Sequence, residues 1–426
     1  MNQITDGILY IDGIDTRELV NTYQSPLMVM SEDSIRDKCR SLKEAFTLKY
    51  ENTRIAYAGK AFLCTAMVKL IDDEGLCLDV VSDGELYTAL QAGFPPERIE
   101  FNGNNKSPEE IRMAVEAGVS RLIVDGTDEI SLIEEECRRA GKTADILIRF
   151  SPGVDSHTHK YITTGNIDSK FGVPLSDGII DNVVAAAMES EYVNLLGFHF
   201  HVGSQLHDNQ SHVMATGILL EMVEKFRKSL GFVPKELNLG GGFGIHYTDE
   251  DNVKPFSYFT DPVMEQIEEY FSEKGLERPA VVIEPGRSIV GESGTTLYSV
   301  GAIKDIPGVR KYVSVNGGMT DNIRPAMYGS LYDCHINVSP EEKRPEEVVT
   351  ICGKCCESGD ILIRDVKVKR PERGDILAVF STGAYCYSMS SNYNMIRKMP
   401  VVMTSQGKSR LIIKGQSYED LLRDFL

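Results

Sequence analysis

The sequence lacks any long apolar run. No stretch of its 426 residues reaches the roughly 18 consecutive apolar residues that a membrane-spanning helix needs. The opening residues, "MNQITDGILYIDG", also lack the basic and apolar regions of a signal peptide. We therefore expect a cytoplasmic protein with no membrane partner.

Basic residues are scarce relative to acidic ones. The 45 Lys and Arg residues face 63 Asp and Glu residues, which gives a net charge of -18 at pH 7. This balance opposes binding to nucleic acid and favours a small-molecule partner. The nine cysteines are odd in number and spread along the chain, unlike the disulfide framework of a secreted domain, so we expect reduced thiols.

The first two-thirds of the chain alternates between strand-like and helix-like segments. The helix-like segments, such as 107–118 and 217–231, have apolar residues at helical spacing and glycine near their ends. Eight such units over about 250 residues match a (β/α)8 barrel, an α/β fold whose functional groups lie at the carboxyl ends of the strands. The β-rich stretches are 55–60, 76–82, 99–103, 121–126, 145–153, 195–203, 236–242 and 280–287.

Short β-rich runs with turns replace this alternation after about residue 286, for example at 311–318 and 375–385. They predict a separate β domain. The strand-like segment 8–14 precedes the barrel, and we expect it to pair with this β domain. The predicted division is a barrel at 32–285 and a β domain formed by 1–31 and 286–426.

Polar residues lie near the ends of several predicted strands. Lys60 in "YAGKAF" ends the first strand in a nearly apolar segment, where loss of solvent would leave a nucleophilic amine suited to a Schiff base. The alternative is a lysine that reaches solvent from a strand end. The glycines of "LNLGGGFG" (237–244) leave backbone N–H groups open to a phosphate, although a tight loop explains them equally well.

Strands six and eight add two histidines and a carboxylate. Strand alternation places His199 and His201 of "GFHFHVGSQ" on one side, as metal ligands or as packed or stacking rings. No other ligand set accompanies them, which disfavours a metal. Glu284 of "IEPGR" either pairs locally with Arg287 or faces a pyridinium nitrogen.

Cysteines cluster in "ICGKCCESGD" (351–360). Cys352, Cys355 and Cys356 could form a zinc or redox site, but no second CxxC completes four ligands. A thiol beside Glu357 could donate a proton, and a buried strand cysteine explains the pattern as well.

Together, Lys60, "HVGSQ", "GGG", "EPGR", "CESGD" and "GAYCYSMSSNYN" resemble the fold-type III, pyridoxal-phosphate-dependent decarboxylases in order and spacing. The match runs from "LYIDGID" to "SYEDLL". "PGVDSHTHKYITTGNIDSKFG" and "MTDNIRPAMYG" are similar to the diaminopimelate branch rather than to its ornithine or arginine relatives. The resemblance implies an alanine-racemase-like barrel, a C-terminal β domain and a head-to-tail homodimer with active sites at the subunit interface.

The resemblance also implies the cofactor, pyridoxal 5'-phosphate, and the residues that hold it. Lys60 would bind its aldehyde, His201 would stack on its ring, and Glu284 would face its ring nitrogen. The phosphate would be held by Ser204, Gly241, Gly242 and the backbone at Gly286 and Arg287. The implied substrate contacts are Arg287, Arg324, Tyr328, Glu357 and Tyr385, of which Tyr385 also lies close to the cofactor.

The implied reaction removes carbon dioxide from meso-2,6-diaminopimelate to give L-lysine, the last step of lysine biosynthesis. Arginines suit the retained carboxylate and Glu357 suits an ammonium group. Cys356 would return a proton to the substrate carbon, and the partner subunit would supply both Cys356 and Glu357. Candidate supporting groups near the ends of strands two and five are Asp79, Glu85 and Arg149.

Three other functions compete with this one. The first is a related decarboxylase for ornithine, arginine or carboxynorspermidine, which "CESGD", Arg324 and Tyr328 disfavour. The second is a non-catalytic binding relative, which the retention of Lys60, Glu284 and Cys356 disfavours. The third is a metal-dependent barrel hydrolase.

Overall fold

The computed structural model describes residues 2–154, 169–176 and 178–426, and these form two compact units. Unit 1 comprises Met1–Lys38, Ile245–Asp251 and Ile289–Leu426, and unit 2 comprises Cys39–Gly244 and Asn252–Ser288. Most of the motif at 152–172 lies outside the described residues. Within them, no helix is both long enough and apolar enough to cross a membrane.

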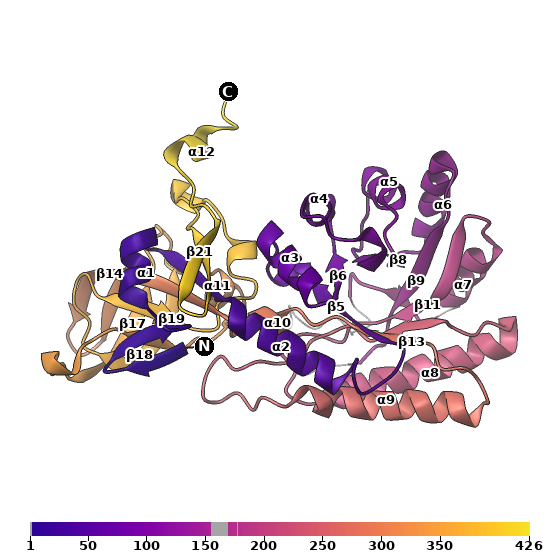
Figure 1. Ribbon diagram of the computed structural model, residues 1–426, viewed down its shortest axis with the longest axis horizontal. Helices are drawn as coiled ribbons and strands as arrows, with labels where there is room; N and C mark the ends of the chain where they lie inside the picture. Colours follow the sequence, from indigo (N-terminus) through magenta and orange to yellow (C-terminus); the bar gives the residue numbers. More distant parts are fainter. Residues whose placement is uncertain (1, 155–168, 177) are drawn as a thin grey trace. The chain divides into compact units, whose positions relative to one another are not determined.

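A closed barrel of eight parallel strands lies at the centre of unit 2 (Figure 1). The strands follow chain order around the ring, which closes where β8 pairs with β9 and β13 pairs with β5. Their largely buried residues are typical of parallel strands covered on both faces, and the predicted α/β barrel is confirmed. The eight strands are β5 Thr53–Ala58, β6 Cys77–Val80, β7 Ile99–Phe101, β8 Arg121–Val124, β9 Ala144–Ser151, β11 Val193–His199, β12 Glu236–Asn238 and β13 Ala280–Ile283; the short β10, Val173–Pro174, pairs with β9.

Helices alternate with these strands. In α5, Ser107 and Glu110 form a capping box at the start, and Gly118 ends the helix in the left-handed region. Helices α8 and α9 run side by side (Figure 1). The helices are α2 Glu32–Ala45, which runs from unit 1 into unit 2, α3 Thr65–Asp73, α4 Asp83–Gln91, α5 Pro108–Ala117, α6 Glu129–Ala140, α7 Ile179–Glu189, α8 Gln210–Leu230 and α9 Phe256–Glu273.

Helix α8 begins before the predicted segment 217–231. Gly217 suggests a helix boundary because glycine is a poor helix former. In the structure Gly217 lies inside α8, whose buried residues on both sides of it include Ala215, Thr216 and Leu219. Tertiary burial therefore overrides the local preference.

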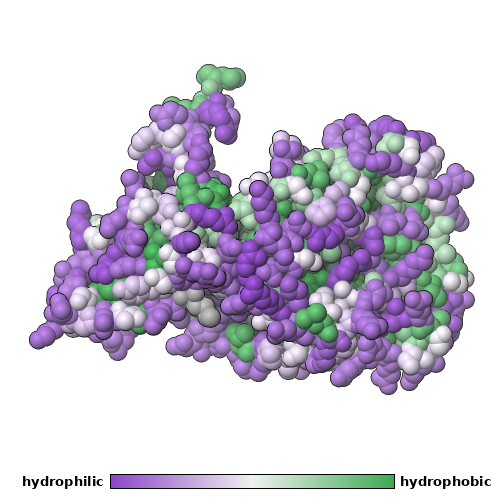
Figure 2. All heavy atoms as spheres, viewed as in Figure 1, coloured by the Kyte–Doolittle hydropathy of each residue, from purple (hydrophilic) through white to green (hydrophobic). Residues whose placement is uncertain are grey.

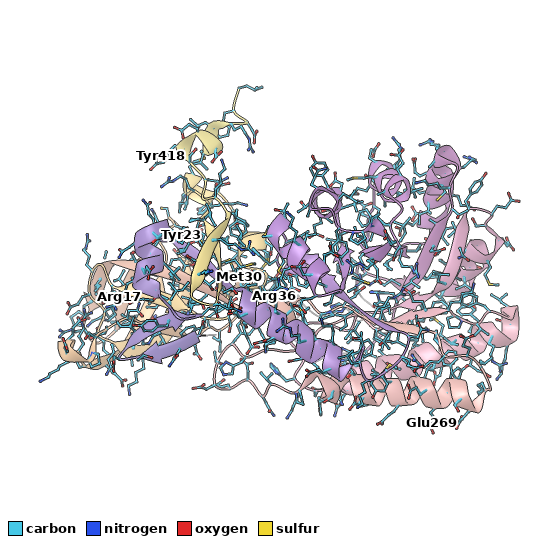
Figure 3. The ribbon with its side chains drawn as sticks, in the orientation of Figure 1. Arg17, Tyr23, Met30, Arg36, Glu269 and Tyr418 are labelled. Atoms are coloured by element: carbon cyan, nitrogen blue, oxygen red, sulfur yellow. The ribbon has the colours of Figure 1, made fainter. Side chains whose placement is uncertain are left out.

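Unit 1 contains a nine-stranded sheet. Its main path is β18-β17-β15-β14-β4-β20-β21, with β19 paired to β14 and β16 paired to β19. Met30 of β4 lies in this sheet (Figure 3). The strands are β4 Leu27–Ser31, β14 Gly294–Ile306, β15 Arg310–Val315, β16 Cys334–Ile336, β17 Glu346–Cys352, β18 Ile361–Lys369, β19 Ile376–Val379, β20 Val401–Ser405 and β21 Lys408–Ile413; the helices are α1 Thr16–Tyr23, α11 Arg324–Tyr328 and α12 Tyr418–Leu422.

The segment 8–14 belongs to unit 1, with the β strands after residue 289 rather than with the barrel, but its strands do not join the nine-stranded sheet. It forms a separate antiparallel sheet of β1 (Asn2–Thr5), β2 (Ile8–Ile11) and β3 (Ile14–Asp15). Two tight turns explain this pairing, because each Asp-Gly pair at 6–7 and 12–13 has positive φ at both residues. The N-terminal strand that enters the larger sheet is β4, between β14 and β20.

Aromatic packing stabilises the core of unit 2, while polar side chains cover most of the visible surface (Figure 2). Phe198 of β11 is 0% exposed. Its ring lies 5.8 Å from those of Phe226 and Phe232.

We expect Phe198→Ala to lower the free energy of unfolding by about 3 to 5 kcal/mol, because it leaves a cavity in the core. Urea unfolding followed by circular dichroism measures the change. The control is Tyr87→Ala, at a side chain that is 57% exposed, with an expected change within about 0.5 kcal/mol. Equal effects of the two substitutions would contradict this description of the core.

Candidate active site

A buried carboxylate lies at the carboxyl end of β13. The two oxygens of Glu284 lie 3.1 and 3.0 Å from Nε2 of His199, the last residue of β11. Oε1 also accepts hydrogen bonds from Asn238 Nδ2 at 2.9 Å and from Asn102 Nδ2 at 3.2 Å. These contacts, rather than a local pair with Arg287, define the surroundings of the carboxylate.

Electrostatics keep Glu284 ionised. Burial alone would raise the pKa of its carboxyl group, but the charge and hydrogen bond of His199, together with Lys60, outweigh burial and lower that pKa to about 2. The barrel therefore presents a fixed negative charge at the end of β13.

The second histidine, His201, is oriented by the glycine loop after β12. Its Nδ1 accepts a hydrogen bond from the Gly241 N–H at 3.3 Å, while His212 Nε2 donates to the Gly241 carbonyl oxygen at 2.8 Å. Burial, followed by the positive charges of Lys60 and Arg149, holds the pKa of His201 well below its usual range. His201 is therefore a neutral, fixed aromatic ring, and the two histidines have different partners.

The glycine loop packs directly on the end of β13. A Cβ atom at Gly241 would lie 2.1 Å from the Glu284 carbonyl oxygen, so a side chain there would displace the loop. Gly242 has φ +103, in the region that favours glycine. Close packing and backbone conformation account for these two glycines without a bound phosphate.

Arg287 and Ser204 meet at the same end of the barrel. Arg287, the first residue of the short helix α10 (Arg287–Val290), is buried and donates from Nη2 to Ser204 Oγ at 2.8 Å. The loop that carries Ser204 is tied to the glycine loop, because the Leu206 N–H donates to the Gly242 carbonyl oxygen at 2.9 Å. A guanidinium, a hydroxyl group and backbone N–H groups thus converge after β11, β12 and β13.

Lys60 follows β5 in a short 3-10 turn, Gly59–Ala61. Of the two interpretations of this lysine, the structure supports the one that reaches solvent from a strand end: Lys60 is exposed, although Gly59 and Ala61 on either side are buried. Its charge still acts on Asp79, Glu85, His201 and Glu284, so it belongs to the same group of residues.

The three candidate supporting residues surround this group. Burial, and then the charge of Glu284, raise the pKa of Asp79 well above its usual range. Glu85 accepts a hydrogen bond from the Val81 N–H at 2.7 Å, and burial raises its pKa. Arg149 is buried, lies 3.4 Å from Asp125 and stacks on the Phe171 ring.

The chemistry of these groups in unit 2 fits pyridoxal 5'-phosphate. A neutral imidazole can stack on a pyridine ring, and an ionised buried carboxylate can hold a proton on its nitrogen. The donors around Arg287 and Ser204 suit a phosphate dianion. The exposed amine of Lys60 can react with an aldehyde.

A second group of predicted residues meets within unit 1. The Arg324 guanidinium lies 5.2 Å from the Tyr328 ring and 5.6 Å from the Tyr385 ring. It also donates to the hydroxyl group of Tyr332 at 3.0 Å. Arg324 is buried, and among the described residues the structure gives it no carboxylate partner. Such a cation is ready to bind a carboxylate.

Tyr385 has a backbone conformation that only a constrained residue keeps. Its φ is +61, in the left-handed region that disfavours residues with a side chain. Residues held in this way often cluster at functional sites. The residue with this constrained backbone is also the one whose ring contacts Arg324.

Cys356 and Glu357 lie in the loop between β17 and β18, and both are exposed. The Cys356 N–H donates to Asn394 Oδ1 at 2.7 Å. Asp360 fixes the loop by accepting from the Met319 N–H at 2.7 Å and from the Cys355 N–H at 2.8 Å. Cys356 also lines a cavity of about 800 Å³ in unit 1.

Sequence reasoning missed several residues that position the site. Asn102 and Asn238, at the ends of β7 and β12, hold Glu284, and His212 holds the glycine loop. A polar side chain at the carboxyl end of an apolar barrel strand was an available signal for both asparagines. No local signal marked His212, which reaches the loop from α8.

Comparisons with known proteins agree with this arrangement. Residues 32–291 match the family described as pyridoxal-dependent decarboxylase, pyridoxal binding domain. The chain is 47% identical to a diaminopimelate decarboxylase of Bacillus subtilis (strain 168) over 98% of this chain and 95% of that protein. It is 44% identical to one of Staphylococcus aureus (strain COL), over 98% of this chain and 97% of that protein.

A solved structure shares the fold of this chain. It is a diaminopimelate decarboxylase from M. jannaschii in complex with L-lysine, with a TM-score of 0.93 and 37% identity. The match covers 100% of this chain and 98% of that one.

We expect iodoacetamide to modify Cys356 before the other eight thiols, because Cys356 is exposed whereas Cys39, Cys137 and Cys386 are buried. Burial also raises the pKa of Cys334 to about 12, which removes its reactive thiolate. Peptide mass spectrometry over a time course measures the order, with Cys356→Ser as the control. Faster modification of a buried thiol would contradict the exposure described here.

Proposed function

Because the chain belongs to the fold-type III, pyridoxal-phosphate-dependent decarboxylases, and among them to the diaminopimelate decarboxylases, we propose that it converts meso-2,6-diaminopimelate to L-lysine and carbon dioxide. The chain is an amino-acid carboxy-lyase whose cofactor is pyridoxal 5'-phosphate. The observation that carries the proposal is the ionised Glu284 carboxylate, held by His199 at 3.0 Å beside a neutral His201.

Pyridoxal phosphate, when bound, supplies an electron sink for the electron pair that carbon dioxide leaves behind. Lys60 holds the aldehyde, and His201 supports the ring. Glu284 keeps a proton on the ring nitrogen because its own pKa is too low for it to take that proton at neutral pH. The phosphate is held by Ser204, Gly241, Gly242, Gly286 and Arg287.

Charged side chains recognise the carboxylate and ammonium groups of the substrate. Arg324, a buried cation with ring contacts to Tyr328 and Tyr385, binds a carboxylate that the reaction retains. Arg287 adds a second guanidinium, and Glu357 binds an ammonium group. A substrate without the distal carboxylate leaves a buried guanidinium unpaired, which can cost a factor of roughly 10⁴ in kcat/KM.

Cys356 returns a proton to the carbon that loses carbon dioxide, and we place it and Glu357 in the active site of a second subunit of a homodimer. Their exposure supports this, because neither is enclosed by its own unit. The C-terminal segment supports it as well: Tyr418, Leu422 and Phe425 are 69%, 57% and 63% exposed. Tyr418 lies on α12 (Figure 3), and the tip of the C-terminal segment is hydrophobic (Figure 2).

A cytoplasmic location belongs to the same proposal. The net charge of -18 at pH 7 favours solubility. All nine cysteines are free thiols in the structure, which a reducing compartment would preserve.

We expect carbon dioxide release from meso-diaminopimelate to exceed release from L-lysine or L-ornithine by about 10³-fold or more in kcat/KM, because only the former has a carboxylate for Arg324 after decarboxylation. Radiolabelled carbon dioxide and amino-acid analysis measure both products. Lys60→Ala, which removes the amine, is the control and should abolish release. Similar rates on all three substrates would refute the assigned specificity, and normal turnover by Lys60→Ala would refute the role of Lys60.

We expect mixtures of Lys60→Ala and Cys356→Ala chains to recover activity that neither has alone. A mixed dimer carries one site with both residues intact, so random exchange should restore about a quarter of wild-type activity. Native mass spectrometry verifies that exchange has occurred. No recovery among verified mixed dimers would show that Cys356 acts within its own chain.

A further inference from the structure

One amide inside the barrel links two acidic side chains. Asn238 Nδ2 donates to Glu100 Oε2 at 2.8 Å and to Glu284 Oε1 at 2.9 Å. Its Oδ1 accepts from the Gly240 N–H at 3.0 Å, at the start of the glycine loop. Asn238 is 0% exposed and Glu100 is 2% exposed. Glu100 is therefore connected through one side chain to both the ionised carboxylate and the glycine loop.

Most of the ionisable groups that act on Glu100 are acidic. The groups that act on Glu100 are the acidic side chains Glu284, Glu236 on β12 and Asp79 on β6, together with the cation Arg54 on β5. That cation is already engaged, because Arg54 and Arg121 both form ion pairs with Glu236. Across the described residues, the structure gives Glu100 no ion pair of its own.

Two carboxyl groups that share one buried amide do not both ionise readily, because like charges in a dry environment repel. The proton belongs on Glu100, since Glu284 alone has His199 as a partner. Burial, and then the charge of Glu284, raise the pKa of Glu100 well above its usual range.

We propose that Glu100 is a positioning residue that stays protonated inside the barrel and, through Asn238, fixes the ionised Glu284 carboxylate and the glycine loop in one arrangement. A neutral Glu100 accepts the N–H of Asn238 without adding charge. An ionised Glu100 would instead favour a proton on Glu284, which could then no longer hold the proton on a ring nitrogen. The consequence for the cofactor rests on the proposed function, but the state of Glu100 does not.

The first test compares the pH dependence of urea unfolding of the cofactor-free full chain with that of Glu100→Gln. A carboxyl group with a raised pKa in the folded chain stabilises it fully below the unfolded pKa, and this contribution is lost as the pH rises towards the folded pKa. Gln is neutral at every pH and mimics protonated Glu. Between about pH 5 and the folded pKa, we expect the unfolding constant of the wild type to rise relative to Glu100→Gln by about tenfold per pH unit.

The control is Glu236→Gln, which makes the same chemical change on a carboxylate that two arginines hold in an ion pair. This variant should have a lower free energy of unfolding than the wild type at neutral pH. The difference between the two should not shrink as the pH rises. If the ratio of the wild-type unfolding constant to that of Glu100→Gln stayed constant over the same pH range, the proposal would be overturned.

The second test asks whether Glu100 positions the site rather than only filling space. Glu100→Met keeps the length of the side chain but removes the acceptor for Asn238, whereas Glu100→Gln keeps an acceptor. In titrations with pyridoxal 5'-phosphate followed by absorbance, we expect Glu100→Met to bind about fivefold more weakly and Glu100→Gln to bind within about twofold of the wild type. Equal affinities of the two variants would overturn the positioning role. Failure of the wild type to bind the cofactor would instead refute the proposed function, and the unfolding result would still stand by itself.

Discussion

Burying the Glu284 carboxylate in an apolar barrel is unfavourable unless a partner compensates for its lost solvent, and His199 is that partner. Its Nε2 lies 3.0 and 3.1 Å from the two carboxylate oxygens. Removing one member of a buried pair of this kind costs about 3 to 5 kcal/mol. The positions of β11 and β13 on either side of β12, and the amides of Asn102 and Asn238, keep this one charge in place.

The backbone of the same residue, Glu284, also holds the glycine loop. The Glu284 N–H donates to the Gly240 carbonyl oxygen at 2.7 Å, and the next glycine has room for no side chain against the Glu284 carbonyl oxygen. Gly241 in turn orients His201. The charge, the aromatic ring and the loop near Ser204 and Arg287 are therefore positioned by one set of contacts, so a change at any of them reaches the others.

The sequence predicted the parts of this arrangement that depend on local pattern. Most barrel strands are rich in buried apolar residues, and polar residues such as Lys60 and Glu284 follow them at the strand ends. Pairing over long distances was not predictable in the same way. Glu100 and Asn238 are 138 residues apart, and no local pattern shows that they share a hydrogen bond. Nor does composition show that β4, rather than β2, enters the large sheet of unit 1.

The exposure of Lys60 shows a further limit. Apolar neighbours in sequence are compatible with a buried amine and with one that reaches solvent, and Lys60, in the 3-10 turn after β5, is exposed. The exposure of a side chain depends on the conformation of that one residue. A strand can be predicted more readily, because several residues contribute to its pattern. The same reasoning applies to His199, whose side of the strand was predictable and whose partner, 85 residues away, was not.

The most direct measurement is the ¹⁵N chemical shift of the ring nitrogen of labelled pyridoxal 5'-phosphate bound to the full chain at neutral pH. An ionised Glu284 predicts a protonated ring nitrogen, with the shift of a pyridinium. The shift of a neutral pyridine would contradict the claim that the barrel is organised around a charged Glu284.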